Sequence, residues 1–345
     1  MGTSAPPRLP AVLAAFARAQ LKRHAPHCLP AALAAFVLTL TTTITTTAAA
    51  GPLASREYPA AHHLPGPAPV AARHHGGLYR ISGKGRVAYL FGTVHVGERS
   101  FYPMAPEAER VLGSADHVVV ELDTRASKDF VRALDRYGRY APGDGIARHV
   151  SPDTLARLRA ALHLEGVSLA SMAHLKPWLI ANLLLGMTLE RQGYRRSDGV
   201  ENALLDEARR RGARVAQLES AEFQLGLFDS MNTIESERYL RETLDGLLDG
   251  SLVKRAQRAI EAWRSGDVAA LDAVLHEATA GASETADFTR RKLLGRRNPD
   301  MAAQIDQLMA EGGVLFVGVG LLHLLGDNGL PQLLAQRGYL VERVY

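Results

Sequence analysis

Cysteine is almost absent from this sequence. The one residue of this type, Cys28, lies near the N-terminus, so the rest of the chain has no disulfide framework, cysteine nucleophile or cysteine-ligated zinc site. Aromatic residues make up only 6% of the chain, whereas 47% of it is apolar and Ala, Leu and Arg are common. This composition favours a helix-rich α/β fold over a β-sandwich, and 345 residues are enough for a large core.

The body of the chain also lacks an excess of positive charge. The formal charge of +4 arises in residues 1–50, which hold four basic side chains and no acidic ones. Basic and acidic residues are equal in number over 51–345. The high isoelectric point therefore gives no reason to expect a nucleic-acid partner.

Long apolar runs are missing as well. The best candidate is LPAALAAFVLTL at 29–40, which is preceded by basic residues and followed by a Thr tract and the small residues AAAG at 48–51. These are the three parts of a secretory signal, and the run is shorter than the about 20 residues of a spanning helix. We predict that 1–50 is a signal peptide and that the mature protein is periplasmic or secreted. The alternative is an uncleaved membrane anchor, with the body facing the periplasm.

Residues 51–77 are rich in Pro, Ala, Gly and His, which is typical of a flexible linker. A metal-sequestering histidine tract is the alternative, since His62, His63, His74 and His75 all lie there. We predict that 78–345 is one folded α/β domain.

Short apolar runs alternate with helical patterns at both ends of this domain. Strands are predicted at 78–82, 86–92, 117–122, 214–219, 314–320 and 339–345, and helices at 104–112, 202–212, 301–311 and 328–337. The first two strands form a hairpin with a Gly-Lys-Gly turn. The middle section is helical in pattern, at 151–163, 168–192, 232–249, 251–265 and 267–279. The expected fold class is α/β, a mainly parallel sheet flanked by helices with a large helical middle section.

Four ionisable residues follow predicted strands: His95, Glu121, Glu219 and His323. In open α/β sheets, ligands bind at the carboxyl ends of the strands. Each histidine closes a G-x-x-H turn, which begins at Gly92 or at Gly320, and we expect these glycines to let the backbone bend tightly after the strand.

Two chemistries remain open for this set of side chains. Imidazoles and carboxylates together are a ligand set for zinc, manganese, cobalt or iron. The same groups can carry out general acid–base catalysis without a metal. A third interpretation is structural, with hydrogen-bonded histidines and glutamates that cap helices. The sequence contains no G-x-S-x-G, H-E-x-x-H, Walker loop or G-x-G-x-x-G after a strand.

Six blocks in order resemble the TraB/GumN family over roughly 78–345. They are LYRISGKGRVAYLFGTVHVG with its G-T-x-H turn, VVVELD, the K-P-W segment at 176–178, GVENALLDEARRRGARVAQLESAEFQ, the pair Arg297-Asn298, and VGVGLLHLLGDNGLPQLLAQRGYLVERV. The chain departs from the family pattern in two places. Within the central block, Glu201 stands where the family usually has Asp, and the family's L-E-T is L-E-S here.

The resemblance implies a fold similar to that of erythromycin esterase-like and ChaN-like proteins. It also implies that His95, Glu121 and His323 form the active site, since related Tiki metalloproteases cleave peptides with manganese or cobalt. Glu121 would be the third metal ligand or the general base. Glu219 and Arg297 would orient these groups or the substrate, and Glu201, Asn298, Gly92 and Gly320 complete the set of site candidates.

We therefore expect an exported metal-dependent hydrolase, of peptidase type, with manganese, cobalt or zinc as cofactor and a peptide or small molecule as substrate. Three alternatives stay open. They are a metal-free ester hydrolase, a periplasmic protein that binds haem or another ligand, and an accessory protein of polysaccharide export.

Overall fold

The protein is described from a computed structural model, which covers residues 75–125 and 128–345. The predicted signal peptide and nearly all of the predicted linker lie outside these residues. His75 is described, and it is buried with its ring 5.0 Å from that of Trp263. No helix in the described part of the chain has the length and apolarity needed to cross a membrane.

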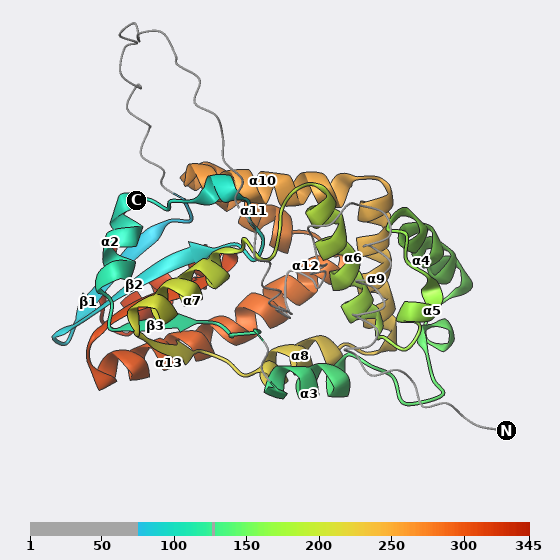
Figure 1. Cartoon of the computed structure of the whole chain (residues 1–345), viewed down its shortest axis with the longest axis horizontal. Coiled ribbons are helices and arrows are strands. Elements are labelled where there is room, and N and C mark those ends of the chain that lie inside the picture. The colour runs from blue at the N-terminus through green and yellow to red at the C-terminus, as the bar shows by residue number, and fades with distance from the viewer. Residues whose placement is uncertain (1–74, 126–127) are drawn as a thin grey trace, which may run out of the picture.

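A mixed, mainly parallel sheet forms one half of the molecule (Figure 1). Its strands are β1 (Leu78–Gly83), β2 (Arg86–Thr93), β3 (His117–Val120), β4 (Arg214–Gln217), β5 (Val314–Gly320) and β6 (Leu340–Arg343). They lie in the order β4-β3-β5-β2-β1-β6. The four strands β2 to β5 run parallel to one another, and β1 is antiparallel to both β2 and β6. The predicted α/β class and mainly parallel sheet are confirmed.

The register of the sheet brings the predicted strand ends to one edge. Thr93 of β2 pairs with Gly320 of β5, and Val120 of β3 pairs with Gly318. The hairpin between β1 and β2 turns at Lys84 and Gly85, which have φ of 54° and 72°. The chain leaves β2, β3 and β5 at neighbouring points, so the residues that follow these strands lie side by side.

Helices cover both faces of the sheet. They are α2 (Pro106–Ser114), α7 (Val200–Arg211), α13 (Arg297–Glu311) and α14 (Leu330–Gln336). Because neighbouring residues of a strand point to opposite faces, Phe316 packs with α2 and α7, and Val317 packs with α13 and α14. Helix α7 ends at Gly212, which has φ of 71°, as the sequence pattern predicts.

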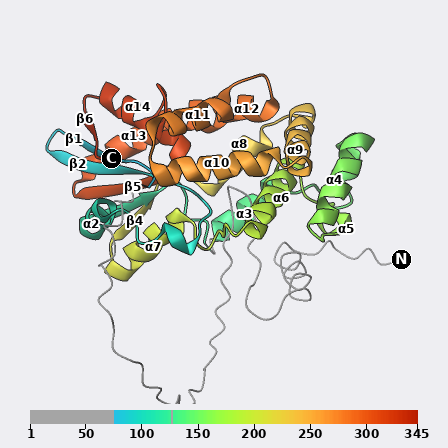
Figure 2. The same cartoon turned by 90° about the horizontal axis from the view of Figure 1, so that it is seen from above.

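The other half of the molecule is helical. It contains α3 (Lys128–Tyr137), α4 (Pro152–Leu164), α5 (Leu169–Met172), α6 (Pro177–Arg191), α8 (Ala221–Asp229), α9 (Thr233–Leu248) and α12 (Glu284–Phe288). Two further helices, α10 (Ser251–Ser265) and α11 (Val268–Thr279), run between the two halves (Figures 1 and 2). Four short segments complete the order: η1 (Arg99–Phe101), η2 (Ile146–Arg148), η3 (Thr289–Arg296) and η4 (Leu321–Leu324).

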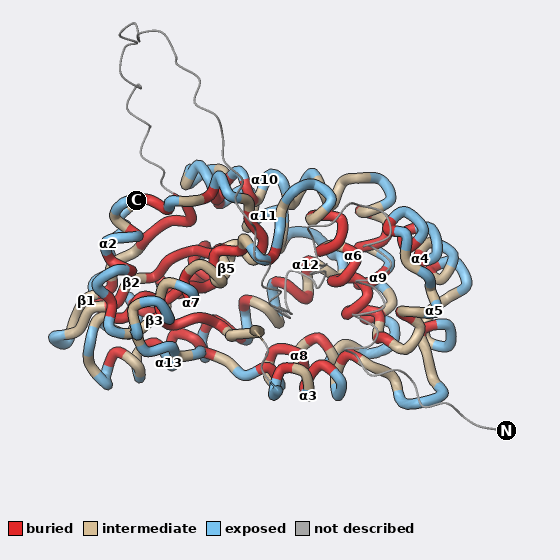
Figure 3. The backbone as a smooth tube through the Cα atoms, in the orientation of Figure 1, coloured by how far each residue is buried: buried red, intermediate tan, exposed pale blue. Residues whose placement is uncertain are grey.

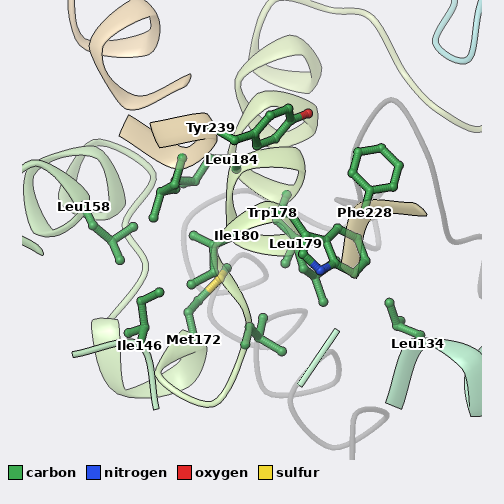
Figure 4. Close-up of a cluster of buried hydrophobic side chains, with 14 of the residues drawn as sticks. Leu134, Ile146, Leu158, Met172, Trp178, Leu179, Ile180, Leu184, Phe228 and Tyr239 are labelled. Carbon is green, nitrogen blue, oxygen red and sulfur yellow. The ribbon is translucent and has the colours of Figure 1, made fainter. Parts of the chain in front are cut away.

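Helix α6 forms the centre of the helical half. Its first residue is Pro177, a favourable position for proline because the first N–H groups of a helix have no partner within it. The helix is buried along most of its length (Figure 3). Trp178 stacks on Phe228 of α8, with ring centroids 5.1 Å apart, within a larger apolar cluster (Figure 4). This core of the helical half is separate from the two cores on the faces of the sheet.

A continuous helical path leads from the helical half to the sheet. It consists of α12, then η3, which is a π-helix, and then α13. The sequence pattern predicted only 301–311 of this path. Pro299 suggests a break at that position. It lies in the first turn of α13, where the N–H that proline lacks would have had no partner within this α-helix.

Candidate functional site

Glu201 fixes the orientation of the His95 imidazole through its Nδ1 atom. This atom lies 2.9 Å from Oε1 of Glu201, and the hydroxyl of Thr93 donates a hydrogen bond to the same carboxylate oxygen. A carboxylate only accepts hydrogen bonds, so Nδ1 carries the proton and Nε2 of neutral His95 keeps its lone pair. Helix α7 begins beside His95, and the backbone N–H of its first residue, Val200, donates to the carbonyl of Val94.

Glu121 follows β3 and is almost completely buried, with 3% of its surface exposed. The backbone N–H of Gly320 donates to its Oε1 at 2.5 Å, and Nη2 of Arg297 donates to its Oε2 at 2.5 Å. Both oxygens therefore have partners, and the side chain has a fixed position at the carboxyl ends of β3 and β5.

His323 lies on η4, directly after β5, and is buried. Its Nδ1 lies 2.5 Å from Oδ1 of Asn298, and its Nε2 lies 3.6 Å from Oε1 of Glu121. The amide nitrogen of Asn298 donates to a backbone carbonyl, so its oxygen must face His323. Nδ1 of His323 consequently carries the proton, and Nε2 presents a lone pair on the Glu121 side.

Gly320 marks the point where the three side chains meet. A Cβ atom placed on Gly320 would lie 3.1 Å from Oε1 of Glu121, 3.6 Å from Cδ2 of His323 and 3.7 Å from Nε2 of His95. The absence of a side chain at this position keeps the space between the two imidazoles and the carboxylate open.

Arg297 joins two strand ends. Its Nη2 reaches Glu121, while its Nε and Nη2 bond to the carboxylate of Glu219 at 2.7 to 3.0 Å. The side-chain amide of Gln224, on α8, donates to the same carboxylate at 2.7 Å. The guanidinium thus stabilises two neighbouring carboxylates that would otherwise repel each other.

Gly92 has a different role from the one predicted for it. It lies within β2, and its carbonyl accepts a hydrogen bond from Nε1 of Trp263 at 2.8 Å. A Cβ there would lie 2.2 Å from the carbonyl oxygen of Gly76. The expectation that both turn glycines serve to bend the backbone is wrong, because Gly320 has an ordinary φ of −51° and neither has positive φ. Glycine suits both positions because other atoms, the Gly76 carbonyl at Gly92 and the Glu121 carboxylate at Gly320, lie where a side chain would begin.

The charges in the site follow from burial and from these contacts. Burial alone would raise the pKa of Glu121, but Arg297 and the two histidines outweigh it and hold this pKa at about 2. Burial lowers the pKa of His323 to about 3, and Arg297 adds to the effect. Burial alone would lower the pKa of His95, but the Glu201 carboxylate raises it above its ordinary value. At neutral pH, Glu121 is therefore an anion and His323 is neutral.

The donor set suits a divalent cation. Nε2 of His95, the ring of His323 and the anionic carboxylate of Glu121 lie around Gly320, and the Nδ1 of each imidazole is bonded to an acceptor oxygen, which is the usual outer support of metal-binding histidines. Arg297 bonds to the carboxylates of Glu121 and Glu219, whereas the carboxylate of Glu201 pairs with His95. Within the described ranges, however, no three side chains of His, Cys, Asp or Glu already stand at metal-ligand spacing.

Most of the predicted site residues come together, with Gly92 as the exception. Three contributors were not predicted. Thr93 shares Glu201 with His95, Asn328 accepts a hydrogen bond from Asn298, and buried Arg196 acts electrostatically to lower the pKa of His95. Thr93 could have been suspected from its place inside the G-T-x-H turn, whereas Asn328 and Arg196 lie in loops without a motif.

Comparisons with known proteins bear on this arrangement. Residues 77–343 match the TraB/PrgY/gumN family. The chain belongs to this family. It is 24% identical over 256 residues to the uncharacterized protein YbaP of Shigella flexneri, an alignment that covers 72% of this chain and 88% of the relative. The YbaP protein of Escherichia coli K12 is also 24% identical, over 253 residues, with 71% and 87% covered. No solved structure matches the chain significantly.

Proposed function

We propose that this TraB/PrgY/gumN family protein is a metal-dependent hydrolase of peptidase type, with its active site around Gly320. One observation carries the proposal. Nε2 of His95, the ring of His323 and Oε1 of Glu121 all lie within 4 Å of the position that a Cβ of Gly320 would occupy. They come from three separate strand ends, in the part of an open α/β sheet where ligands bind.

In this proposal His95, His323 and Glu121 hold the divalent ion. Glu201 and Asn298 fix the two imidazoles through their Nδ1 atoms, and Arg297 fixes the carboxylate. A bound manganese, cobalt or zinc ion would lower the pKa of water enough for it to attack a carbonyl near neutral pH, and would polarise that carbonyl.

Glu121 suits the role of a ligand better than that of a general base. Its pKa of about 2 means that it takes up a proton only weakly at neutral pH. Glu219 and Arg297 lie one step further from Gly320. Arg297 would keep Glu121 ionised, and Glu219 would hold the guanidinium of Arg297 in place.

Metal-free hydrolysis is a second candidate, and the pairing of His95 with Glu201 favours it. The carboxylate raises the pKa of His95, and Nε2 of this residue faces Gly320. This nitrogen could take a proton from an attacking water, as in other His–carboxylate pairs. The two candidates differ in their response to chelators.

The decisive activity experiment is cleavage of a mixed peptide library by the full chain, with added manganese, cobalt or zinc and with a chelator. We expect metal-dependent cleavage that His323→Ala abolishes and that His276→Ala, on the exposed surface of α11, leaves unchanged. Cleavage that survives the chelator would favour the metal-free candidate. Cleavage by His323→Ala at the wild-type rate would exclude this site as the active site.

The location of the protein is part of the same proposal. The basic start, apolar run and small-residue end within 1–50 support export, which would place the site in the periplasm or outside the cell. A peptidase there would act on extracytoplasmic peptides. Fractionation of expressing cells, with N-terminal sequencing of the product, tests both export and cleavage near residue 50.

A further inference from the structure

A line of hydrogen bonds runs from the π-helix η3 to His323. Nδ2 of Asn328 donates to the carbonyl of Leu294 at 3.2 Å. The carbonyl of Asn328 accepts from Nδ2 of Asn298 at 2.6 Å, and Oδ1 of Asn298 accepts from Nδ1 of His323 at 2.5 Å. We propose that Asn328 is a positioning residue that, through Asn298, holds His323 with its proton on Nδ1 and its lone pair on Nε2.

The orientation of the Asn298 amide is the critical step. An amide side chain can present either oxygen or nitrogen to a neighbouring imidazole, and the two choices select opposite tautomers. A backbone carbonyl can only accept a hydrogen bond, so the Asn328 carbonyl fixes the nitrogen of Asn298 on its own side. Asn298 has only 1% of its surface exposed, so water cannot readily replace this bond.

The side chain of Asn328 determines where that carbonyl lies. It belongs to the segment between His323 and α14, and it ties this segment to Leu294 inside η3. The same Leu294 carbonyl also accepts the backbone N–H of Arg297, the residue that orients Glu121. One carbonyl of the π-helix thus fixes the positions of groups on both sides of the proposed site, which agrees with the frequent occurrence of π-helical segments at functional sites.

Asn328 is suited to a substitution test because its own surface is largely exposed, so that truncation opens no core cavity. The inference rests on the proposed function in one respect, since a free Nε2 matters only if His323 binds an ion or a proton. The tautomer itself can be measured in the metal-free protein, without any activity.

The experiment is long-range ¹H–¹⁵N NMR of the full chain labelled with ¹⁵N-histidine, near neutral pH, with the His323 signals assigned from His323→Gln. We expect the wild type to show a single tautomer, with Nδ1 protonated and Nε2 bare. Asn328→Ala should populate the Nε2–H tautomer. Asn328→Asp should do so as well, since it keeps the shape but cannot donate to Leu294. Asn232→Ala is the matched control, because it removes an asparagine that caps α9 and should leave the His323 signals unchanged.

Two further measurements complete the test. Asn298→Asp added to Asn328→Ala should restore the wild-type tautomer, because a carboxylate accepts from Nδ1 in either orientation. Titration with manganese alone should show affinity about 10- to 100-fold weaker in Asn328→Ala, the usual effect of losing an outer partner of a metal ligand.

The outcomes separate the two proposals. If both Asn328 variants keep the wild-type tautomer, the positioning role is refuted. If the wild type binds no manganese while the tautomer shifts as expected, the positioning role stands and the metal-dependent function fails.

Discussion

At the scale of single residues, the site depends on groups that other residues hold in one protonation state. Oxygen atoms of Glu201 and Asn298 select the tautomers of His95 and His323, and Arg297 keeps Glu121 ionised. The identities of these residues could be predicted from the sequence, since they follow strands or lie in family motifs. Their hydrogen bonds could not, because each joins residues that are far apart in the chain.

Gly320→Ala tests whether the space at the centre of the site matters. The backbone φ of −51° suits alanine, so we expect normal folding. The added methyl group would lie 3.1 Å from Oε1 of Glu121 and should displace the carboxylate or the imidazoles. A misplacement of this size should reduce catalysis by about 100-fold. The measurements are thermal unfolding and peptide cleavage.

Gly113→Ala is the matched control for this substitution. Gly113 lies in α2, and a Cβ there would meet nothing within 4 Å. Since alanine favours helix, this variant should be more stable by about 0.5–1 kcal/mol and fully active. Equal activity of Gly320→Ala and Gly113→Ala would contradict the account of the site.

The buried imidazole of His323 should also make stability depend on pH. Its folded pKa of about 3 lies below the ordinary value of 6.5, so the unfolded chain binds a proton between these values and the folded protein does not. Stability from this group is complete above pH 6.5 and falls as the pH is lowered towards 3. Between pH 7 and pH 5 the loss should be on the order of 2 kcal/mol.

Urea unfolding of the wild type and His323→Gln at pH 7 and pH 5 measures this contribution. The wild type should lose more free energy of unfolding than the variant over this interval, because other titrating groups are common to both. Parallel pH dependence in the two proteins would show that His323 is not kept neutral by burial.

At the scale of helices and strands, the elements with a clear period were predictable. The hairpin β1–β2, strand β5 and helix α7 all follow their sequence patterns closely. Helices α3, α8 and α12 were not among the predicted segments. The sequence of α3 is clearly amphipathic, so this helix could have been predicted, whereas α12 has only five residues, too few for a period to show. The π-helix η3 was missed because its hydrogen bonds span five residues, which the 3.6-residue period of an α-helix does not reveal.

The link between α10 and β2 gives a prediction at this scale. Trp263 of α10 donates its indole N–H to the carbonyl of Gly92, next to the turn that carries His95. Trp263→Phe leaves that carbonyl without this donor, which should cost about 1–3 kcal/mol beyond the change in packing. Denaturant unfolding measures the loss.

Trp178→Phe is the comparison for this prediction. Trp178 is equally buried, but its indole nitrogen has no hydrogen-bond acceptor among the residues that the structure describes. The same substitution there changes only packing, so we expect a smaller loss of stability. A loss in Trp178→Phe as large as that in Trp263→Phe would mean that the bond to Gly92 does not stabilise the end of β2.

At the scale of the whole molecule, the site lies where the sheet meets the helical half (Figure 1). Three of its residues follow β2, β3 and β5, whereas Gln224 comes from α8 and Asn298 from the path α12-η3-α13. The sequence pattern predicted that polar residues follow the strands. It could not predict their meeting, because strand order is set by packing between segments more than 200 residues apart.

Metal binding by the full chain is the most direct test of the central claim that these residues form one metal site. The measurement is calorimetric titration of the metal-free protein with manganese, cobalt and zinc, beside the variant His95→Ala/His323→Ala. We predict close to one equivalent bound by the wild type, and a large loss of affinity in the variant. Binding in the wild type no stronger than in the variant would contradict the claim and leave the His95–Glu201 pair as the basis for a metal-free site.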